Sequence, residues 1–229
     1  YLDNSRTQEA YNKIVNGDAD IIFVAQPSDG QKKRAEKSGV TLLYTPFARE
    51  AFVFIVNADN PVNSLTEQQV RDIFSGAITN WRAVGGDDQE IQTRQRPEDS
   101  GSQTVMLSQV MKNVRMISPQ ETEVASMMEG MIKVVAEYRN TNNAIGYTFR
   151  YYATQMNADK NIKLLAINGI APTAENIRND KYPYIVDALM VTRENTTSET
   201  QKLVEWFLTP QGQSLVEDVG YVPMYKTLH

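Results

Sequence analysis

The sequence predicts an α/β fold, and three observations carry this prediction. Residues 19–25, ADIIFVA, form a continuous apolar run of the kind found in strands that are buried on both faces. Residues 50–57, EAFVFIVN, are the most strand-like segment of the chain. Amphipathic helical segments alternate with these runs, and a strand, helix, strand order is typical of an α/β fold with a largely parallel sheet.

The first elements follow in a regular order. A helix is expected at residues 5–17, with Ser5 or Thr7 as its N-cap and Gly17 as its end. A turn and a charged amphipathic helix are expected at residues 27–39, and a short strand at residues 40–48. The apolar face of the first helix consists of Ala10, Tyr11, Ile14 and Val15.

A well-marked helix is expected at residues 64–76, where Thr66 and Gln69 form a capping box and Gly76 ends the helix. Residues 78–96 are expected to form a loop and then a strand. A methionine-rich helix is expected at residues 124–138, and methionines at helical spacing are far more often core residues than metal ligands. Its apolar residues are Met127, Met128, Met131, Val134 and Val135.

The remaining elements suggest how the chain is divided. Residues 143–169 are interpreted as strand, helix and strand, residues 184–195 as an apolar strand, and residues 198–208 and 210–220 as two helices. The apolar strands that end near Asn57 and near Val191 flank a central block about as large as the remainder. Two lobes joined by two chain crossings would produce this pattern, and a single three-layer α/β domain is the alternative.

The stretch RQRPEDSGSQT, residues 94–104, has the chemistry of an anion site. Ser100 stands where an N-cap belongs, Gln103 completes a capping box, and an apolar helical face follows. The free N–H groups and the positive dipole end of such a helix favour anions, and Arg96 lies four residues before the cap. The alternative is an ordinary capped helix that contacts only water.

The composition excludes several classes of protein. A net charge of -5 without a cluster of lysines and arginines argues against nucleic-acid binding, so local geometry would have to select any anion. The chain has no cysteine, and its one histidine is the terminal His229, which excludes thiolate chemistry and argues against a Ser–His–Asp triad. No run of 18 apolar residues is present, so no membrane-spanning helix is expected.

Long motifs, in order over nearly the whole chain, resemble the phosphate-binding proteins of ABC transporters. They are residues 65–81 (LTEQQVRDIFSGAITNW), 84–86 (VGG), 96–104 (RPEDSGSQT), 143–147 (NAIGY) and 209–225, which include GYVP. The resemblance implies a two-lobed type II periplasmic-binding-protein-like fold with mixed sheets, flanking helices and two hinge crossings. Lobe 1 would hold residues 1–57 and 188–229 and lobe 2 residues 58–187, with hinges near Asn57 and Asp187. The family's first strand and ligand-contacting loop are expected to precede residue 1.

The resemblance also implies a ligand site. The family's Arg-x-x-x-Ser-Gly-Ser/Thr clamp falls on Arg96, Ser100, Gly101 and Ser102, and the opposite hydroxyl at a helix N-terminus falls on Ser5 or Thr7. Arg6 is a candidate by charge alone. Relatives usually carry a carboxylate near the end of the first buried strand, which accepts the proton of phosphate and repels sulfate. Gln26 stands there instead, and Asp29 or Glu50 is the alternative acceptor.

The resulting expectation is an extracytoplasmic receptor, periplasmic or a surface lipoprotein whose signal segment is not in this chain. It would be a monomer that captures inorganic phosphate in an interlobe cleft and delivers it to an ABC permease, without cofactor, metal, catalytic residues or nucleic acid. A receptor for another oxyanion or small acidic ligand, or a sensing or adhesion protein of the same fold, is the second hypothesis. A hydrolase that uses Ser100 or Ser102 comes third, because the sequence offers no base, metal set or nucleophile elbow.

Overall fold

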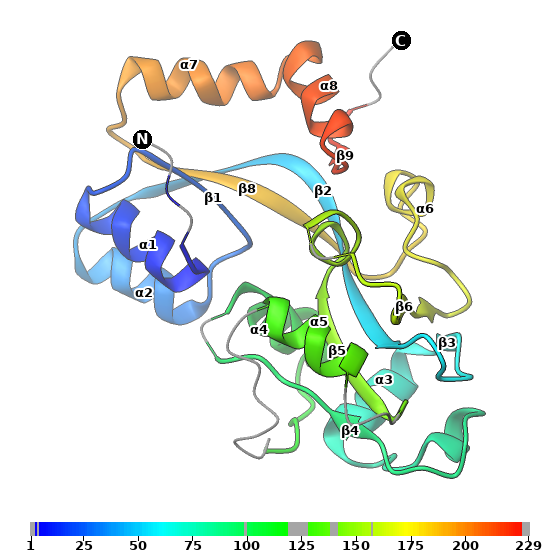
Figure 1. Ribbon diagram of the computed structural model, residues 1–229. Helices are drawn as coiled ribbons and strands as arrows, with labels where there is room; N and C mark the ends of the chain where they lie inside the picture. Colours follow the sequence, from blue (N-terminus) through cyan, green and yellow to red (C-terminus); the bar gives the residue numbers. More distant parts are fainter. Residues whose placement is uncertain are drawn as a thin grey trace. The chain divides into compact units, whose positions relative to one another are not determined.

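The computed structural model describes Asp3 and residues 5–98, 100–118, 128–137, 142–156 and 158–225 (Figure 1). Two compact units emerge: unit 1 comprises Tyr1–Glu50, Glu98–Thr104 and Val186–His229, and unit 2 comprises Ala51–Pro97 and Val105–Ile185. Residues 98–104, which the sequence analysis assigned to the second lobe, thus group with unit 1. The lobe boundaries near Asn57 and Asp187 stay a prediction.

Unit 1 begins with two helices. The first, α1, spans Thr7–Asn16 and ends at Gly17, as predicted, with φ of 87° in the left-handed region. Its N-cap is Arg6, which makes no side-chain cap bond, so the assignment of the cap to Ser5 or Thr7 was wrong. The second helix, α2, spans Asp29–Lys37 and begins with a capping box between Ser28 and Gln31.

The strands of unit 1 pair differently from the prediction. Strand β1, Ile21–Val24, runs antiparallel to β8, Ile185–Arg193, with Ile22 opposite Val191. Strand β8 lies between β1 and β2, and the short β9, Val222–Pro223, pairs antiparallel with β2 at Ala48 and Arg49. The expected largely parallel sheet is therefore corrected, because both of these pairings are antiparallel and β1 pairs with a strand from the far end of the chain and not with its neighbour in sequence.

Alternate residues of these strands face two separate cores. On one face, Ile22, Leu189 and Val191 pack against Tyr11 and Ile14 of α1 and other residues of α1 and α2. On the other face, Phe47 and Met190 pack against the helices α7, Ser198–Phe207, and α8, Pro210–Asp218. Figure 1 shows the same layering, with α1 and α2 on one side of β1 and β8 and α7 on the other. Strand β1 was expected to be buried on both faces, but Phe23 is 44% exposed.

One buried amide joins three segments of unit 1. The Nε2 atom of Gln213 donates to the carbonyl oxygens of Phe47, at 2.9 Å, and Phe207, at 2.8 Å. Its Oε1 atom accepts the N–H of Met224 at 2.6 Å. Since Gln213 is only 1% exposed, these bonds satisfy an amide that would otherwise be costly to bury.

Unit 2 is built around the second part of β2. The sequence analysis expected two strands at residues 40–48 and 50–57, whereas β2 is one strand, Leu42–Asn57, that passes through Pro46 without a break. Its residues 52–56 run antiparallel to β5, Ala144–Phe149, and residues 55–57 run antiparallel to β6, Ile162–Leu164. Strand β4, Gln92–Thr93, runs parallel to β5.

The remaining elements of unit 2 surround these strands. A separate parallel pair joins β3, Ser64–Leu65, to β7, Ala166–Ile167. Helix α3, Glu67–Ser75, has the predicted capping box of Thr66 and Gln69 and ends at Gly76 in the left-handed conformation. The other helical segments are the 3-10 turn Trp81–Val84, the π-helical segments Met106–Met111 and Tyr152–Met156, α5 at Met128–Glu137 and α6 at Ala174–Arg178.

Aromatic rings fill the core of unit 2. The ring centroid of Tyr147 lies 5.5 Å from those of both Phe52 and Phe74. Met131 of α5 is buried, as expected for a core methionine, whereas Met127 lies outside the described residues. The side chains of Met128 and Val134 and the whole of His229 also lie outside them.

Two helical glycines should respond oppositely to substitution by alanine. A Cβ atom on Gly212 of α8 would lie 2.3 Å from the carbonyl oxygen of Trp206 and 2.6 Å from Cα of Phe207, both backbone atoms of α7. We expect Gly212→Ala to lower the free energy of unfolding by about 1–3 kcal/mol. Gly130→Ala should raise it by about 0.5–1 kcal/mol, because a Cβ atom on Gly130 of α5 would have no neighbour within 4 Å. Urea unfolding checks both values, and similar midpoints for the two variants would contradict the packing argument.

Candidate functional site

At the start of α1, the residue in the N-cap position does not cap the backbone donors with its side chain. Thr7 is the first helical residue, and Arg6 at the N-cap position makes no side-chain hydrogen bond to the first turn. The first N–H groups of a helix have no partner within the helix and carry its positive dipole end. Ser5 and Arg6, just ahead of the helix, are both exposed.

Gly101 brings a second helix start against the first. It is the buried first residue of α4, Gly101–Val105, which continues directly into the π-helical segment Met106–Met111. A Cβ atom on Gly101 would lie 2.8 Å from Cβ of Ala25 and 3.3 Å from Oγ1 of Thr7. Only a residue without a side chain allows this approach, so the glycine of the motif is explained by packing within unit 1.

Ser100 has the predicted role of N-cap. Its Oγ atom accepts the N–H of Gln103 at 3.2 Å. The carbonyl oxygen of Ser100 accepts both the N–H of Thr104, at 3.0 Å, and the Thr104 hydroxyl, at 3.2 Å. The turn that begins α4 is thus held by its own hydrogen bonds.

Ser102 is the residue of the motif whose hydroxyl lacks a hydrogen bond in the described structure. It is 2% exposed, and its Oγ atom is buried without a hydrogen-bond partner in the described structure. Burying a hydroxyl without a partner costs about 1–3 kcal/mol, so such a group in a native structure calls for an explanation. Ser102 follows directly after Gly101, the residue that closely approaches Thr7 at the start of α1. A small group that accepts hydrogen bonds would satisfy it.

Arg96 belongs to unit 2, where a tyrosine fixes its backbone. The N–H of Arg96 donates to Oη of Tyr147, at 3.1 Å, and Tyr147 is fully buried on β5. Burial raises the pKa of the Tyr147 hydroxyl, and the nearby charge of Arg96 opposes that rise only in part. The hydroxyl therefore stays protonated at neutral pH. Tyr147 lies within the NAIGY motif, but no role for it could be predicted from the sequence, because only the pairing of β4 with β5 brings it to Arg96.

The other candidates differ in how accessible they are. Gln26 is partly buried and follows Ala25, the residue that contacts Gly101. Asp29 is exposed in the first turn of α2, and Glu50 is buried within β2. Arg94, the other arginine of the stretch, is also buried, and its backbone N–H donates to the carbonyl oxygen of Ile145 at 2.8 Å.

Neither a metal site nor a membrane-spanning helix is found among the described residues. No group of three histidine, cysteine, aspartate or glutamate residues is placed to hold a metal ion there. Within the same part of the chain, no helix combines the length and the apolar character needed to span a membrane.

Comparison with known proteins assigns the family. Residues 2–211 match the PBP superfamily domain. The chain belongs to the PBP superfamily. This superfamily consists of binding proteins, so the prediction that the chain is not an enzyme is confirmed.

Two curated relatives share about a quarter of their residues with this PBP superfamily member. The phosphate-binding protein PstS of Borreliella burgdorferi is 26% identical over 183 residues, which cover 78% of this chain and 64% of the relative. The phosphate-binding protein PstS of Bacillus subtilis is 28% identical over 170 residues, which cover 74% of this chain and 53% of the relative. The match thus spans between about half and two thirds of the length of these relatives.

The fold comparison agrees with the family assignment. The crystal structure of an ABC-type phosphate transport receptor from Vibrio cholerae superimposes with a TM-score of 0.69, at 24% identity, over 94% of this chain and 84% of that one. The predicted type II periplasmic-binding-protein-like α/β fold with mixed sheets is therefore confirmed.

Two neighbouring serines should affect stability in opposite directions. Ser102→Ala removes a buried hydroxyl without a partner, so we expect the ligand-free protein to gain about 1 kcal/mol in the free energy of unfolding. Ser100→Ala removes a helix cap and should cost about 1 kcal/mol. Urea unfolding in a buffer free of oxyanions measures both. A loss of stability in Ser102→Ala as large as that in Ser100→Ala would show that the Ser102 hydroxyl has a partner.

Proposed function

We propose that this chain is an extracytoplasmic solute receptor that captures inorganic phosphate for import by an ABC permease. The observation that supports this best is the buried hydroxyl of Ser102, which has no hydrogen-bond partner among the described residues and follows directly after Gly101, next to Thr7 of α1. The names of the relatives, which are phosphate-binding proteins, favour phosphate among the small oxyanions.

The residues of unit 1 would form a cradle of neutral donors. The hydroxyls of Ser102 and Thr7, with the backbone N–H groups of the first turns of α1 and α4, can all donate to oxygen atoms of one anion. Ser5 could add a further hydroxyl. Gly101 contributes by its lack of a side chain, because any Cβ atom there would meet Thr7 and Ala25.

Arg96 would supply the positive charge. A guanidinium group donates two parallel hydrogen bonds to an oxyanion, which fixes the orientation of the anion as well as adding energy. Because the net charge of the chain is -5, the overall field would repel an anion, and these local donors would have to outweigh it. Tyr147 would act as a positioning residue, since its hydroxyl holds the backbone of Arg96 at 3.1 Å.

The family membership supports a proposal for the wider role. We propose a monomer, periplasmic or anchored to the cell surface as a lipoprotein, with lobes at residues 1–57 plus 188–229 and at residues 58–187. A binding protein of this kind needs neither a cofactor nor a resident metal.

A second candidate ligand, another oxyanion, is favoured by Gln26. This residue follows Ala25, which contacts Gly101, and it is an amide where the resemblance implies a carboxylate. An amide both donates and accepts, so it can face an anion that carries no proton. Calorimetric titration with phosphate, arsenate, sulfate and molybdate tests both candidates directly.

The proposed role of Arg96 predicts a specific loss. Arg96→Ala should weaken phosphate binding by about 2–5 kcal/mol. Arg96→Lys should also weaken it, because lysine keeps the charge but cannot donate two parallel hydrogen bonds. Arg82→Ala is the matched control, since it removes the same charge from a side chain that is 75% exposed. The site assignment fails if Arg96→Ala binds phosphate as the unsubstituted protein does.

The amide of Gln26 predicts weak discrimination between phosphate and sulfate. Sulfate should compete with phosphate in the unsubstituted protein, and monoanionic and dianionic phosphate should bind with similar affinity. Gln26→Glu should lower sulfate affinity by about tenfold or more, ~1.4 kcal/mol, because two buried acceptors would then repel each other. Gln68→Glu, which adds the same charge on exposed α3, should change neither value. If the unsubstituted protein already rejects sulfate and Gln26→Glu has no effect, another acceptor selects the ligand and Gln26 has no such role.

A further inference from the structure

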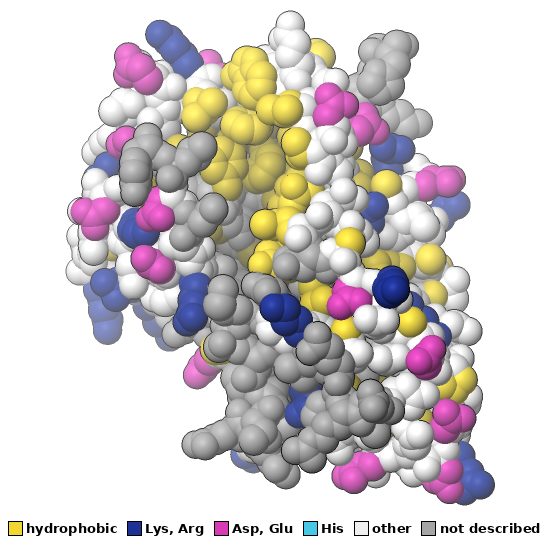
Figure 2. Space-filling view, in the orientation of Figure 1, with side chains coloured by type: hydrophobic (Ala, Val, Ile, Leu, Met, Phe, Trp, Pro, Cys, Tyr) yellow, Lys and Arg dark blue, Asp and Glu magenta, His cyan; other side chains and the backbone are white. Residues whose placement is uncertain are grey.

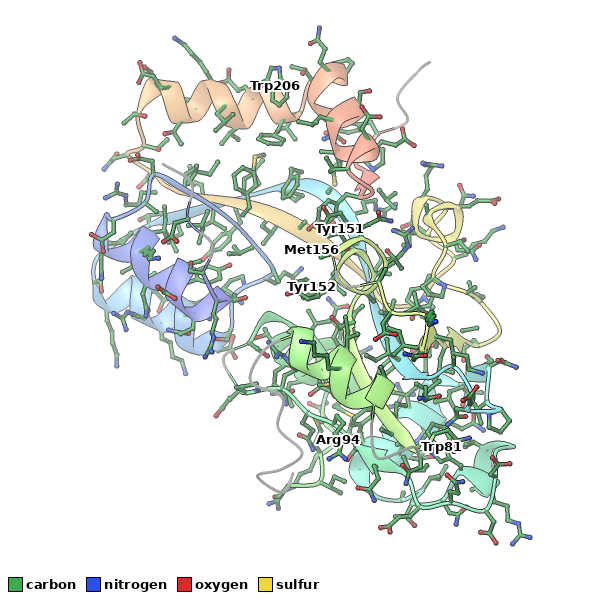
Figure 3. All side chains as sticks on the ribbon, viewed as in Figure 1. Trp81, Arg94, Tyr151, Tyr152, Met156 and Trp206 are labelled. Carbon is green, nitrogen blue, oxygen red and sulfur yellow. The ribbon has the colours of Figure 1, made fainter. Side chains whose placement is uncertain are left out.

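A buried tyrosine of α1 is bonded to the backbone that follows β1. Tyr11 is only 2% exposed, and its Oη atom donates to the carbonyl oxygen of Ala25 at 3.0 Å. Burial raises the pKa of this hydroxyl, so it stays protonated and able to donate. Figure 2 shows charged side chains over the outer face of α1 and α2, and Figure 3 shows other side chains that extend from α1 toward β1. The hydroxyl of Tyr11 thus makes a polar bond within an otherwise apolar layer.

Ala25 takes part in the close contact at the candidate site. Its Cβ atom is the nearest neighbour, at 2.8 Å, that a Cβ atom on Gly101 would meet, and Oγ1 of Thr7 would be 3.3 Å away. Thr7 lies four residues before Tyr11 on α1, and residues at this spacing share one face of a helix. Tyr11 therefore ties together two of the three segments that meet at Gly101.

A second set of bonds holds the other end of the segment after β1. The N–H of Ser28 donates to Oε1 of Gln31 at 2.9 Å, and Nε2 of Gln31 donates to Oε1 of Gln8 at 2.9 Å. Gln31 is only 3% exposed, and Gln8 belongs to α1. Residues 25–28 are thus bonded to α1 at both ends, directly through Tyr11 and indirectly through Gln31.

Gln26 lies between these two bonds and has little conformational freedom. It precedes Pro27, whose ring disfavours the helical conformation for the residue before it. The peptide between Ala25 and Gln26 is trans and planar, so its N–H points opposite to the carbonyl oxygen that Tyr11 holds. The hydroxyl of Tyr11 therefore sets the direction of the backbone from which the Gln26 amide extends.

We propose that Tyr11 is a positioning residue of the oxyanion site, which places Gln26 there by holding the carbonyl of Ala25. The inference rests on the proposed function and adds a residue that selects the anion indirectly. The hydroxyl hydrogen of Tyr11 is used by Ala25, so it is not available to donate to the anion itself. Tyr147 holds the backbone of Arg96 in unit 2 by a bond of the same kind, whereas Tyr11 acts within unit 1.

The test compares two buried tyrosines. Tyr11→Phe removes only the hydroxyl, and Tyr182→Phe is the matched control, because Tyr182 of unit 2 is 1% exposed and its Oη atom donates to the carbonyl oxygen of Phe52 at 3.2 Å. Both variants lose a buried hydrogen bond of one kind and should become less stable to a similar extent. In calorimetric titration well below both unfolding midpoints, only Tyr11→Phe should bind phosphate and sulfate about tenfold more weakly. In a buffer free of oxyanions, only this variant should show faster hydrogen exchange at the amides of Gln26 and Ser28.

A double-mutant cycle identifies the route of the effect. Because Tyr11 acts through Gln26, Tyr11→Phe should weaken binding much less in a Gln26→Ala background than in the unsubstituted protein. Additive effects of the two substitutions, unchanged exchange at Gln26, or unchanged affinity of Tyr11→Phe would overturn the positioning role while the proposed function stands. An equal loss of affinity in Tyr182→Phe would also overturn it, since the effect would then be general loss of stability. If the unsubstituted protein binds no oxyanion, the proposed function fails and the positioning role fails with it.

Discussion

The close approach of α4 to α1 is the constraint on which the candidate site depends. At Gly101 the two helix starts and the end of β1 meet so closely that a single methyl group would not fit. The contact fixes the backbone just before Ser102, whose hydroxyl is buried. A motif that could be interpreted as a string of ligand donors is therefore also a packing motif. The glycine of this motif determines where the donors lie, and the serine hydroxyls determine which kind of group the motif can bind.

The two units hold their key polar groups by different means. In unit 1, the donors around Thr7 and Ser102 are neutral and depend on helix geometry. In unit 2, Arg96 carries a full charge, and the buried Tyr147 hydroxyl fixes its backbone. Neutral donors cost less to bury than charges do, which explains why the hydroxyl of Ser102 can be fully buried without a counter-charge.

Local features of the fold were predictable from the sequence, and non-local ones were not. The cap at Ser100, the capping box of Thr66 and Gln69 and the end of α1 at Gly17 depend on residues within one turn, so sequence patterns suffice to find them. Strand pairing depends on residues far apart: β1 pairs with β8 across more than half of the chain. Two strands were expected at residues 40–48 and 50–57, but they form the single strand β2.

The candidate site shows the same division. Its motif positions could be named from the sequence, because the resemblance to a family specifies residue types at fixed spacing. The burial of Ser102 and the hydrogen bond between Arg96 and Tyr147 arise only when distant segments pack together.

The amide of Gln213 has a consequence for how unit 1 opens. One side chain bonds to β2, to the end of α7 and to the segment that carries β9, so none of the three can separate without breaking a buried hydrogen bond. Segments coupled in this way open together as one cooperative unit. Amide protons in these segments should then exchange with a common opening free energy, although β2 lies far from the other two segments in the chain.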